Sequence, residues 1–82
     1  NPKSLLQEQI QSEGRGTPHY QLASSQGPDH NPWFEVEVLV DSEVMGRGQG
    51  GKKVDAERAA AQDALDRIIE SLHEAPSRPE IR

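Results

Sequence analysis

The chain has 82 residues, no cysteine and a formal net charge of −5, and 32% of its residues are apolar. This length is enough for one small domain and too short for two, and the lack of cysteine excludes disulfides and cysteine-ligated zinc. The acidic balance argues only weakly against nucleic-acid binding, because such binding depends on where the charges lie.

The first part of the chain predicts a helix followed by a strand. Asn1 can cap a helix and Pro2 suits its first position, so we expect a helix from there to about Glu13. Gly14 is a suitable terminator for it. The segment HYQLASS, residues 19–25, is predicted to form the first strand, and a turn cluster rich in proline and glycine follows.

The middle of the chain predicts an antiparallel meander. The segment WFEVEVLV, residues 33–40, alternates with the period of a strand that has one buried face. The buried face is expected to carry Phe34, Val36, Val38 and Val40, and the solvent face Glu35 and Glu37. Trp33, beside Phe34, is also expected to belong to the core. Residues 41–43 suit a hairpin loop, and a third strand is predicted from Val44 to about Gly48.

The last predicted element is a helix of about five turns that begins at about Lys52. Apolar residues recur along it every four positions and form one stripe: Ala56, Ala60, Ala64, Ile68 and Leu72, flanked by Ala61, Leu65 and Ile69. Residues 73–82 have no periodicity and are expected to be a flexible tail after a domain of residues 1–72. The order predicts an α+β fold, α-β-β-β-α, with two helices on one face of a three-stranded antiparallel sheet.

The run GRGQGGKK, residues 46–53, places glycines and lysines where the third strand passes into the second helix. It contains GxGxxG, but dinucleotide binding by that motif requires a parallel βαβ unit, and no further strand is predicted here. It is also one residue short of a Walker A loop, and Lys53 stands where a serine or threonine would hold Mg²⁺. We therefore do not expect a bound nucleotide.

Two interpretations of Lys52 and Lys53 are open from this stretch alone. The lysines are either ordinary solvated surface or a phosphate site. The first turn of a helix has unpaired N–H groups and a partial positive charge, so lysines are unfavourable there unless an anion binds. Glycines beside them would let a nucleic-acid backbone come close.

The first predicted helix has two different faces. The side expected to pack on the sheet carries Leu5, Leu6, Gln9 and Ile10. The opposite side carries mainly small or amide-bearing side chains: Ser4, Gln7, Glu8 and Gln11. This stripe is either an ordinary solvated face or a reader of groups that both donate and accept hydrogen bonds, such as the ribose 2′-hydroxyls of A-form RNA.

Four motifs in family order and spacing resemble the double-stranded RNA-binding domain, specifically the one at the C-terminus of bacterial ribonuclease III. They are NPKSLLQEQIQ, PHYQL, GPDHNPWFEVEV and GRGQGGKKVDAERAAAQDAL, and they cover about residues 1–70. The resemblance implies the same α-β-β-β-α fold. It also implies binding to double-stranded RNA by shape, through 2′-hydroxyl and phosphate contacts over about 16 base pairs, with little sequence preference.

The resemblance implies three contact regions on the duplex. The first helix would lie in one minor groove through Ser4, Gln7, Glu8 and Gln11. The loop between the first two strands would enter the next minor groove through Gly27, Pro28, Asp29 and His30, with His30 as the side-chain probe. The start of the second helix would meet phosphates through Gly51, Lys52 and Lys53, with Arg47 nearby.

One departure from the family concerns the start of the second helix. The family usually has Ser-Lys-Lys there, and the aligned residues in this chain are Lys52, Lys53 and Val54. Lys52 therefore stands where the capping serine is expected. With Asp55 and Glu57 close by, we expect weaker phosphate binding than in a typical member and a shallow salt dependence.

No catalytic constellation is recognisable, and we expect no cofactor in this domain and no metal site. The resemblance implies the substrate-binding module of a ribonuclease III that cleaves double-stranded RNA in rRNA and mRNA processing. Its catalytic nuclease domain, in the same parent chain, would use Mg²⁺, and the parent would be a cytoplasmic homodimer. The absence of an initiator Met suggests a fragment or a processed product, which we expect to be monomeric, with no membrane segment. The alternative is a module of this fold that binds a protein, with weak or no RNA binding.

Overall fold

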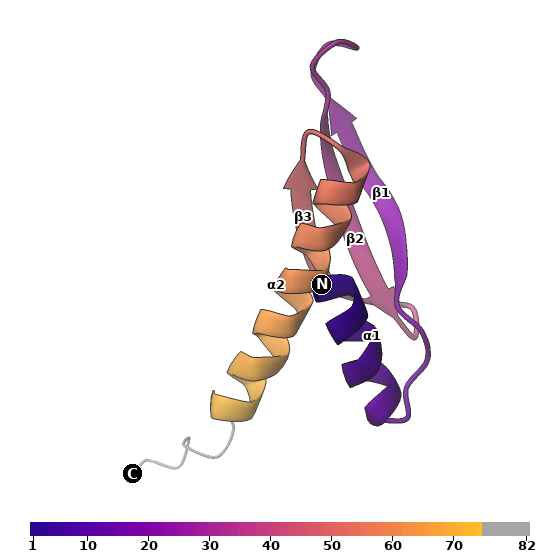
Figure 1. Ribbon diagram of the computed structural model, residues 1–82, viewed down its shortest axis with the longest axis vertical. Helices are drawn as coiled ribbons and strands as arrows, with labels where there is room; N and C mark the ends of the chain where they lie inside the picture. The colour runs from indigo at the N-terminus through magenta and orange to yellow at the C-terminus, as the bar shows by residue number, and fades with distance from the viewer. Residues whose placement is uncertain (75–82) are drawn as a thin grey trace.

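The computed structural model describes residues 1–74, which form two helices and three strands in the predicted order (Figure 1). The elements are α1 (Pro2–Ser12), β1 (His19–Gln26), β2 (Trp33–Val40), β3 (Glu43–Gly50) and α2 (Lys53–Glu74). The predicted α-β-β-β-α order is confirmed. Helix α2 continues two residues beyond the domain end predicted at Leu72, and the rest of the predicted tail lies outside the described residues. None of the described helices combines the length and the apolar character needed to cross a membrane.

The strands form one antiparallel sheet in the order β1-β2-β3. A two-residue turn at Asp41 and Ser42 joins β2 to β3, and the φ angles of these residues are 53° and 70°. Two consecutive left-handed residues are typical of the type I′ hairpin turn, whose twist matches that of the flanking strands. The turn therefore fixes the register that places the valines of β2 on one face.

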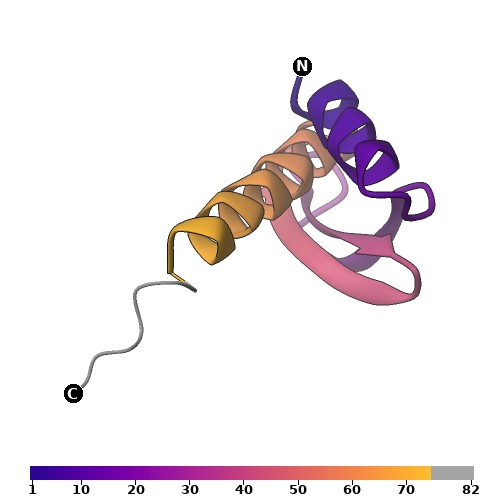
Figure 2. The ribbon, with the colours of Figure 1, turned by 90° about the horizontal axis from the view of Figure 1, so that it is seen from below.

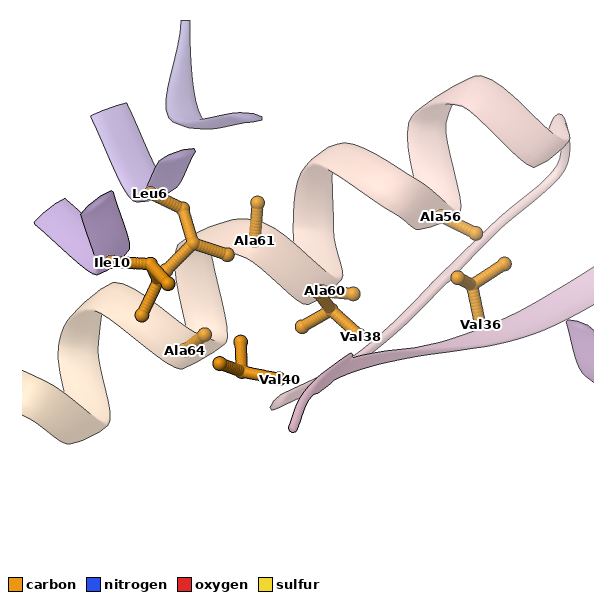
Figure 3. Close-up of a cluster of buried hydrophobic side chains, with 9 residues drawn as sticks. All are labelled: Leu6, Ile10, Val36, Val38, Val40, Ala56, Ala60, Ala61 and Ala64. Carbon is orange, nitrogen blue, oxygen red and sulfur yellow. The ribbon is translucent and has the colours of Figure 1, made fainter. Parts of the chain in front are cut away.

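Both helices lie on the same side of the sheet (Figure 2). Helix α2 packs over β2 and β3, and α1 packs against α2. The buried core between them comprises Leu6, Ile10, Val36, Val38, Val40, Ala56, Ala60, Ala61 and Ala64 (Figure 3). The predicted alternation of β2 is thus confirmed, and Phe34 packs against the edge of this core.

The helix-facing positions of β3 are glycines because α2 lies too close to the strand for any side chain. A Cβ built on Gly48 would lie 2.2 Å from the Ala60 nitrogen, and one on Gly46 would lie 2.5 Å from the Ala60 carbonyl oxygen. Both obstacles are backbone atoms, so no side-chain movement could relieve the clash. The hypothesis that the glycine run admits a nucleic-acid backbone is therefore wrong for Gly46 and Gly48, and only Gly51 lies in the exposed connection.

Four side chains assigned to the apolar faces are instead about half exposed or more: Leu5 at 54%, Trp33 at 49%, Ile69 at 51% and Leu72 at 69%. Helix α1 meets the core through Leu6 and Ile10, and Leu5 instead lines the exposed groove between α1 and α2. Trp33 precedes Phe34 in a pleated strand and so lies on the outer face of the sheet. The last turns of α2 extend past the sheet (Figure 1). Ile69 and Leu72 belong to these turns, and the described elements cover them only in part.

Candidate nucleic-acid interface

The polar stripe of α1 is exposed over its whole length. It comprises Ser4, Gln7, Glu8 and Gln11, and all four are open to solvent, as the helical spacing predicted. Two features of the chain orient the helix: the Asn1 side chain accepts a hydrogen bond from the Lys3 N–H at 3.0 Å, and Leu6 and Ile10 are buried on the opposite side. The stripe can therefore meet a flat partner without repacking of the core.

The loop between β1 and β2 has a defined shape. Gly27 has φ +86°, and a Cβ on it would lie 2.8 Å from the Asn31 carbonyl oxygen, so only glycine suits this position. The Asn31 N–H donates to the Pro28 carbonyl at 2.9 Å and closes a turn. Residues Pro28, Asp29 and His30 are all exposed on this turn, which projects from one end of the molecule (Figure 1).

The start of α2 exposes Gly51, Lys52 and Lys53. Lys52 is the residue before the helix, and its carbonyl accepts the first helical hydrogen bond, from Ala56 N at 3.0 Å. Its side chain is a donor and cannot accept from the N–H groups of the first turn, as a serine would. Those N–H groups and the two ammonium groups are therefore available to an anion at the same place.

Neighbouring side chains modify the charge at this helix start. The Lys53 ammonium lies over the Phe34 ring, 5.8 Å from its centroid and within the range of a cation–π contact. Asp55, in the first turn, lies 3.6 Å from an Arg58 guanidinium nitrogen. Arg58 of the same helix thus partly neutralises the negative charge of Asp55. The potential at the helix start is therefore less negative than the sequence alone suggests.

The three exposed regions are neighbours in space. A Cβ on Gly51 would lie 3.9 Å from the Pro32 carbonyl oxygen, which places the start of α2 next to the end of the β1–β2 loop. On the other side, Lys3 of α1 lies 2.6 Å from Glu57 of α2. The loop, the start of α2 and the first turn of α1 therefore follow one another along the molecule, which can contact an elongated ligand at three successive points.

Acidic residues of the sheet lie on the opposite side. Glu37 accepts a hydrogen bond from Gln21 at 3.0 Å and pairs with Arg47 at 3.2 Å, on the face away from the helices. Arg47 was expected near the phosphate site, and this is wrong, because it lies on the outer face of the sheet. Glu37 is also more covered than expected, since its side chain is only 16% exposed. The net charge of −5 thus coexists with a lysine-bearing helix start.

Sequence reasoning missed a contact among Lys3, Tyr20 and Glu57. The Lys3 ammonium lies 4.7 Å from the centroid of the Tyr20 ring. The Tyr20 hydroxyl is buried and has no hydrogen-bond partner among the described residues. Burial, and secondarily the Glu57 carboxylate, raises the pKa of Tyr20 above its ordinary value. Lys3 and Glu57 are 54 residues apart in the chain, and no local sequence pattern predicts such a pairing.

No group of three or more His, Cys, Asp or Glu side chains within residues 1–74 is arranged to hold a metal ion.

Comparison with known proteins identifies one family and several relatives. The chain matches the family described as double-stranded RNA binding motif over residues 2–68. Ribonuclease 3 of Roseiflexus sp. (strain RS-1) is 48% identical over 66 residues, which cover 80% of this chain and 28% of that protein. Ribonuclease 3 of Protochlamydia amoebophila is 43% identical over 68 residues, which cover 83% of this chain and 28% of that protein. The solved structure of Arabidopsis HYL1 has a TM-score of 0.72 and 31% identity, covering 83% of this chain and 96% of that one.

The chain spans only part of the curated proteins it matches. The aligned segment covers 26–31% of the length of the ribonuclease 3 sequences compared. It therefore corresponds to one module of those proteins.

Proposed function

The chain belongs to the double-stranded RNA-binding domain family, and from this premise we propose that it binds duplex RNA through the three exposed regions described above. The α1 stripe would read 2′-hydroxyls in one minor groove, and the Pro28–His30 turn would probe the next one. Lys52 and Lys53 would meet phosphates across the intervening major groove. This division of contacts gives shape recognition with little dependence on sequence.

One observation supports the proposal most strongly: the three regions follow one another as a strip along the molecule, joined where Gly51 lies next to Pro32 and where Lys3 contacts Glu57. The hydroxyl and amide groups of the α1 stripe can donate and accept, which suits a 2′-hydroxyl that does both. The lysines stand at a helix start where N–H groups are also free to meet an oxyanion. An ordinary solvated surface would not be expected to place these hydrogen-bonding side chains, the β1–β2 turn and the lysines next to one another.

We further propose that the chain is the substrate-binding module of a ribonuclease III that processes rRNA and mRNA. The ribonuclease 3 relatives support this part of the proposal. In such a parent, a Mg²⁺-dependent nuclease domain of the same chain would form a cytoplasmic homodimer. The module described here would raise the local concentration of duplex at that dimer through a linker. It would itself be monomeric and would need no cofactor.

The proposal is tested by titrating a fluorescent RNA duplex of about 20 base pairs with matched variants. His30→Ala and Lys53→Ala should each weaken binding several-fold, because each removes one of the three contacts. Arg67→Ala is the control, because it removes the same charge as Lys53→Ala from the distant half of α2. Equal affinities for the Lys53 and Arg67 variants would contradict the assigned phosphate contact.

A protein-binding function is the second candidate, and the exposed groove between α1 and α2 favours it. This groove is lined by Leu5, Glu8, Gln9, Ser12, Gln62, Leu65 and Ile69. A module that works through this groove would be indifferent to Lys53→Ala, while Leu5→Ala and Ile69→Ala would weaken binding of its partner. The same set of variants therefore separates the two functions.

A further inference from the structure

The first turn of α1 is joined to the rest of the fold through the side chain of Lys3. Leu6 and Ile10 bury the second and third turns, but no apolar side chain in the first turn is fully buried. The Lys3 ammonium pairs instead with the Glu57 carboxylate at 2.6 Å, and both side chains are about two-thirds covered, with exposures of 35% and 30%. This partial cover distinguishes the pair from a loose surface ion pair, which solvent would screen.

The same ammonium also contacts β1. It lies over the face of the Tyr20 ring, 4.7 Å from the centroid. Lys3 therefore connects three elements at one point: its own helix, the carboxylate of α2 and the aromatic ring of β1. A contact of this kind restricts the direction of the first turn of α1 more than a single ion pair would.

The pair also joins two of the RNA-facing regions. Lys3 immediately precedes Ser4 at the beginning of the α1 stripe. Glu57 lies four residues after Lys53, one helical turn from the phosphate-facing lysines. A change in the Lys3–Glu57 separation would therefore change the separation between a minor-groove contact and a phosphate contact.

We propose that Lys3 and Glu57 are positioning residues for RNA binding, which hold α1 and the start of α2 at the separation that a duplex requires. This inference rests on the proposed function. With the pair intact, both contacts are organised before the duplex arrives. With the pair broken, the first turn of α1 must be ordered during binding, and that entropy cost lowers the affinity.

Glu57→Gln separates this role from simple electrostatics, because the two explanations predict opposite signs. The substitution removes a negative charge close to the phosphate site and releases the Lys3 ammonium toward the RNA. Electrostatics alone therefore predicts tighter binding. A positioning role predicts weaker binding in spite of the more favourable charge. Glu70→Gln is the matched control, because it makes the same charge change on an exposed part of α2 away from the strip.

The experiment titrates an RNA duplex of about 20 base pairs with four proteins, each below its unfolding temperature. The proteins are the wild type, Glu57→Gln, Glu70→Gln and Lys3→Arg. Glu57→Gln should weaken binding on the order of threefold to tenfold, the range of a coupled pair. Lys3→Arg keeps a cation for both Glu57 and Tyr20 and should bind like wild type. Amide exchange without RNA should become faster at Leu5 of Glu57→Gln, because the Leu5 N–H donates to the Asn1 carbonyl at 3.1 Å and so closes the first turn of α1. A thermal melt confirms that this variant is folded.

Three outcomes are decisive. Weaker binding by Glu57→Gln, with faster exchange in the first turn and an unaffected Glu70→Gln, supports the positioning role. Equal or tighter binding by Glu57→Gln overturns it while leaving the proposed function intact. Failure of the wild type itself to bind RNA overturns the proposed function, and the positioning role with it.

Discussion

Lys52 occupies the position where a helix usually has a side chain that accepts hydrogen bonds from its first turn. Its carbonyl accepts from Ala56, but its ammonium cannot accept from any N–H group. Lys52 therefore leaves the helix without a side-chain cap and places a positive charge at its start. An anion can supply the missing acceptor, and this is the role proposed for RNA phosphate.

Substituting Lys52 by serine should therefore stabilise the free protein. Lys52→Ser supplies the missing cap and should raise the free energy of unfolding by about 1 kcal/mol, measured by urea denaturation. Lys53→Ser removes the same charge inside the first turn and should give no such increase. Equal effects of the two variants would show that relief of charge, and not capping, accounts for the change.

Tyr20 gives a second prediction for a single residue, through the ionisation of its hydroxyl. Its pKa is raised in the folded protein, so above about pH 10 the unfolded chain loses a proton that the folded chain keeps. Stability should therefore be independent of this group below pH 10 and should fall as the pH rises above it. Tyr20→Phe should abolish this part of the alkaline loss. It should not lower stability at pH 7, since the buried hydroxyl has no hydrogen-bond partner within residues 1–74.

Thermal unfolding of both proteins between pH 7 and pH 11 would measure the effect. Identical alkaline profiles for wild type and Tyr20→Phe would contradict it.

At the scale of elements, the close approach of α2 to β3 dominates the fold. Alanines on the helix face glycines on the strand, so two backbones pack almost directly on each other. This close packing gives a dense core to a chain that has few large apolar residues. It also determines where the first turn of α2, with its lysines, lies relative to the β1–β2 loop.

Gly48→Ala should be strongly destabilising, since its Cβ would lie 2.2 Å from a backbone nitrogen of α2. We expect a loss of about 3 kcal/mol, at the upper end for overpacking, because the helix itself must move. Gly51→Ala is the matched control, since its Cβ would meet only one atom at an ordinary 3.9 Å. Calorimetric melting of both variants tests the contrast, and similar melting temperatures would contradict the packing account.

The elements and their order were predictable because each has a strong local period. The alternation of β2 and the four-residue repeat of α2 depend on neighbouring positions only. The glycine run was misread because its reason is the approach of α2, which no local pattern contains. Leu5 and Ile69 were misplaced because helical periodicity predicts an apolar face but not how far the neighbouring element covers it.

The candidate site was predictable to different degrees. The polar stripe of α1 and the exposed lysines follow from helical geometry and are confirmed as exposed. Their adjacency was implied only by the family resemblance, and the Lys3–Glu57 contact was not foreseen at all. That contact joins two residues 54 positions apart in the chain, which only the assembled fold brings together.

For the whole molecule, the separation of charge matters more than the total. The net charge is −5, yet part of the acidic charge lies on the outer face of the sheet, where Glu37 is paired with Arg47. Few cations remain on the proposed RNA-facing strip. Electrostatics should therefore contribute little to the affinity, and hydrogen bonding to the duplex should contribute more.

The salt dependence of binding tests this balance. With Lys52 and Lys53 as the main phosphate contacts, the plot of log K against log salt concentration should have a slope of about −2. Lys53→Ala should make the slope shallower by about one. A wild-type slope of about −6 or steeper would mean that many more cations engage the RNA than the strip provides.

The most direct measurement compares a blunt RNA duplex of about 20 base pairs with a DNA duplex of the same sequence, titrated with this protein at low and physiological salt. We predict binding to RNA at both salt concentrations and much weaker binding to DNA, because only RNA offers 2′-hydroxyls in a wide, shallow minor groove. Equal binding to both duplexes would mean that the protein recognises the phosphate charge and not the 2′-hydroxyls. No binding to RNA at low salt would contradict RNA binding by this domain and would favour the α1–α2 groove as the binding surface for a protein partner.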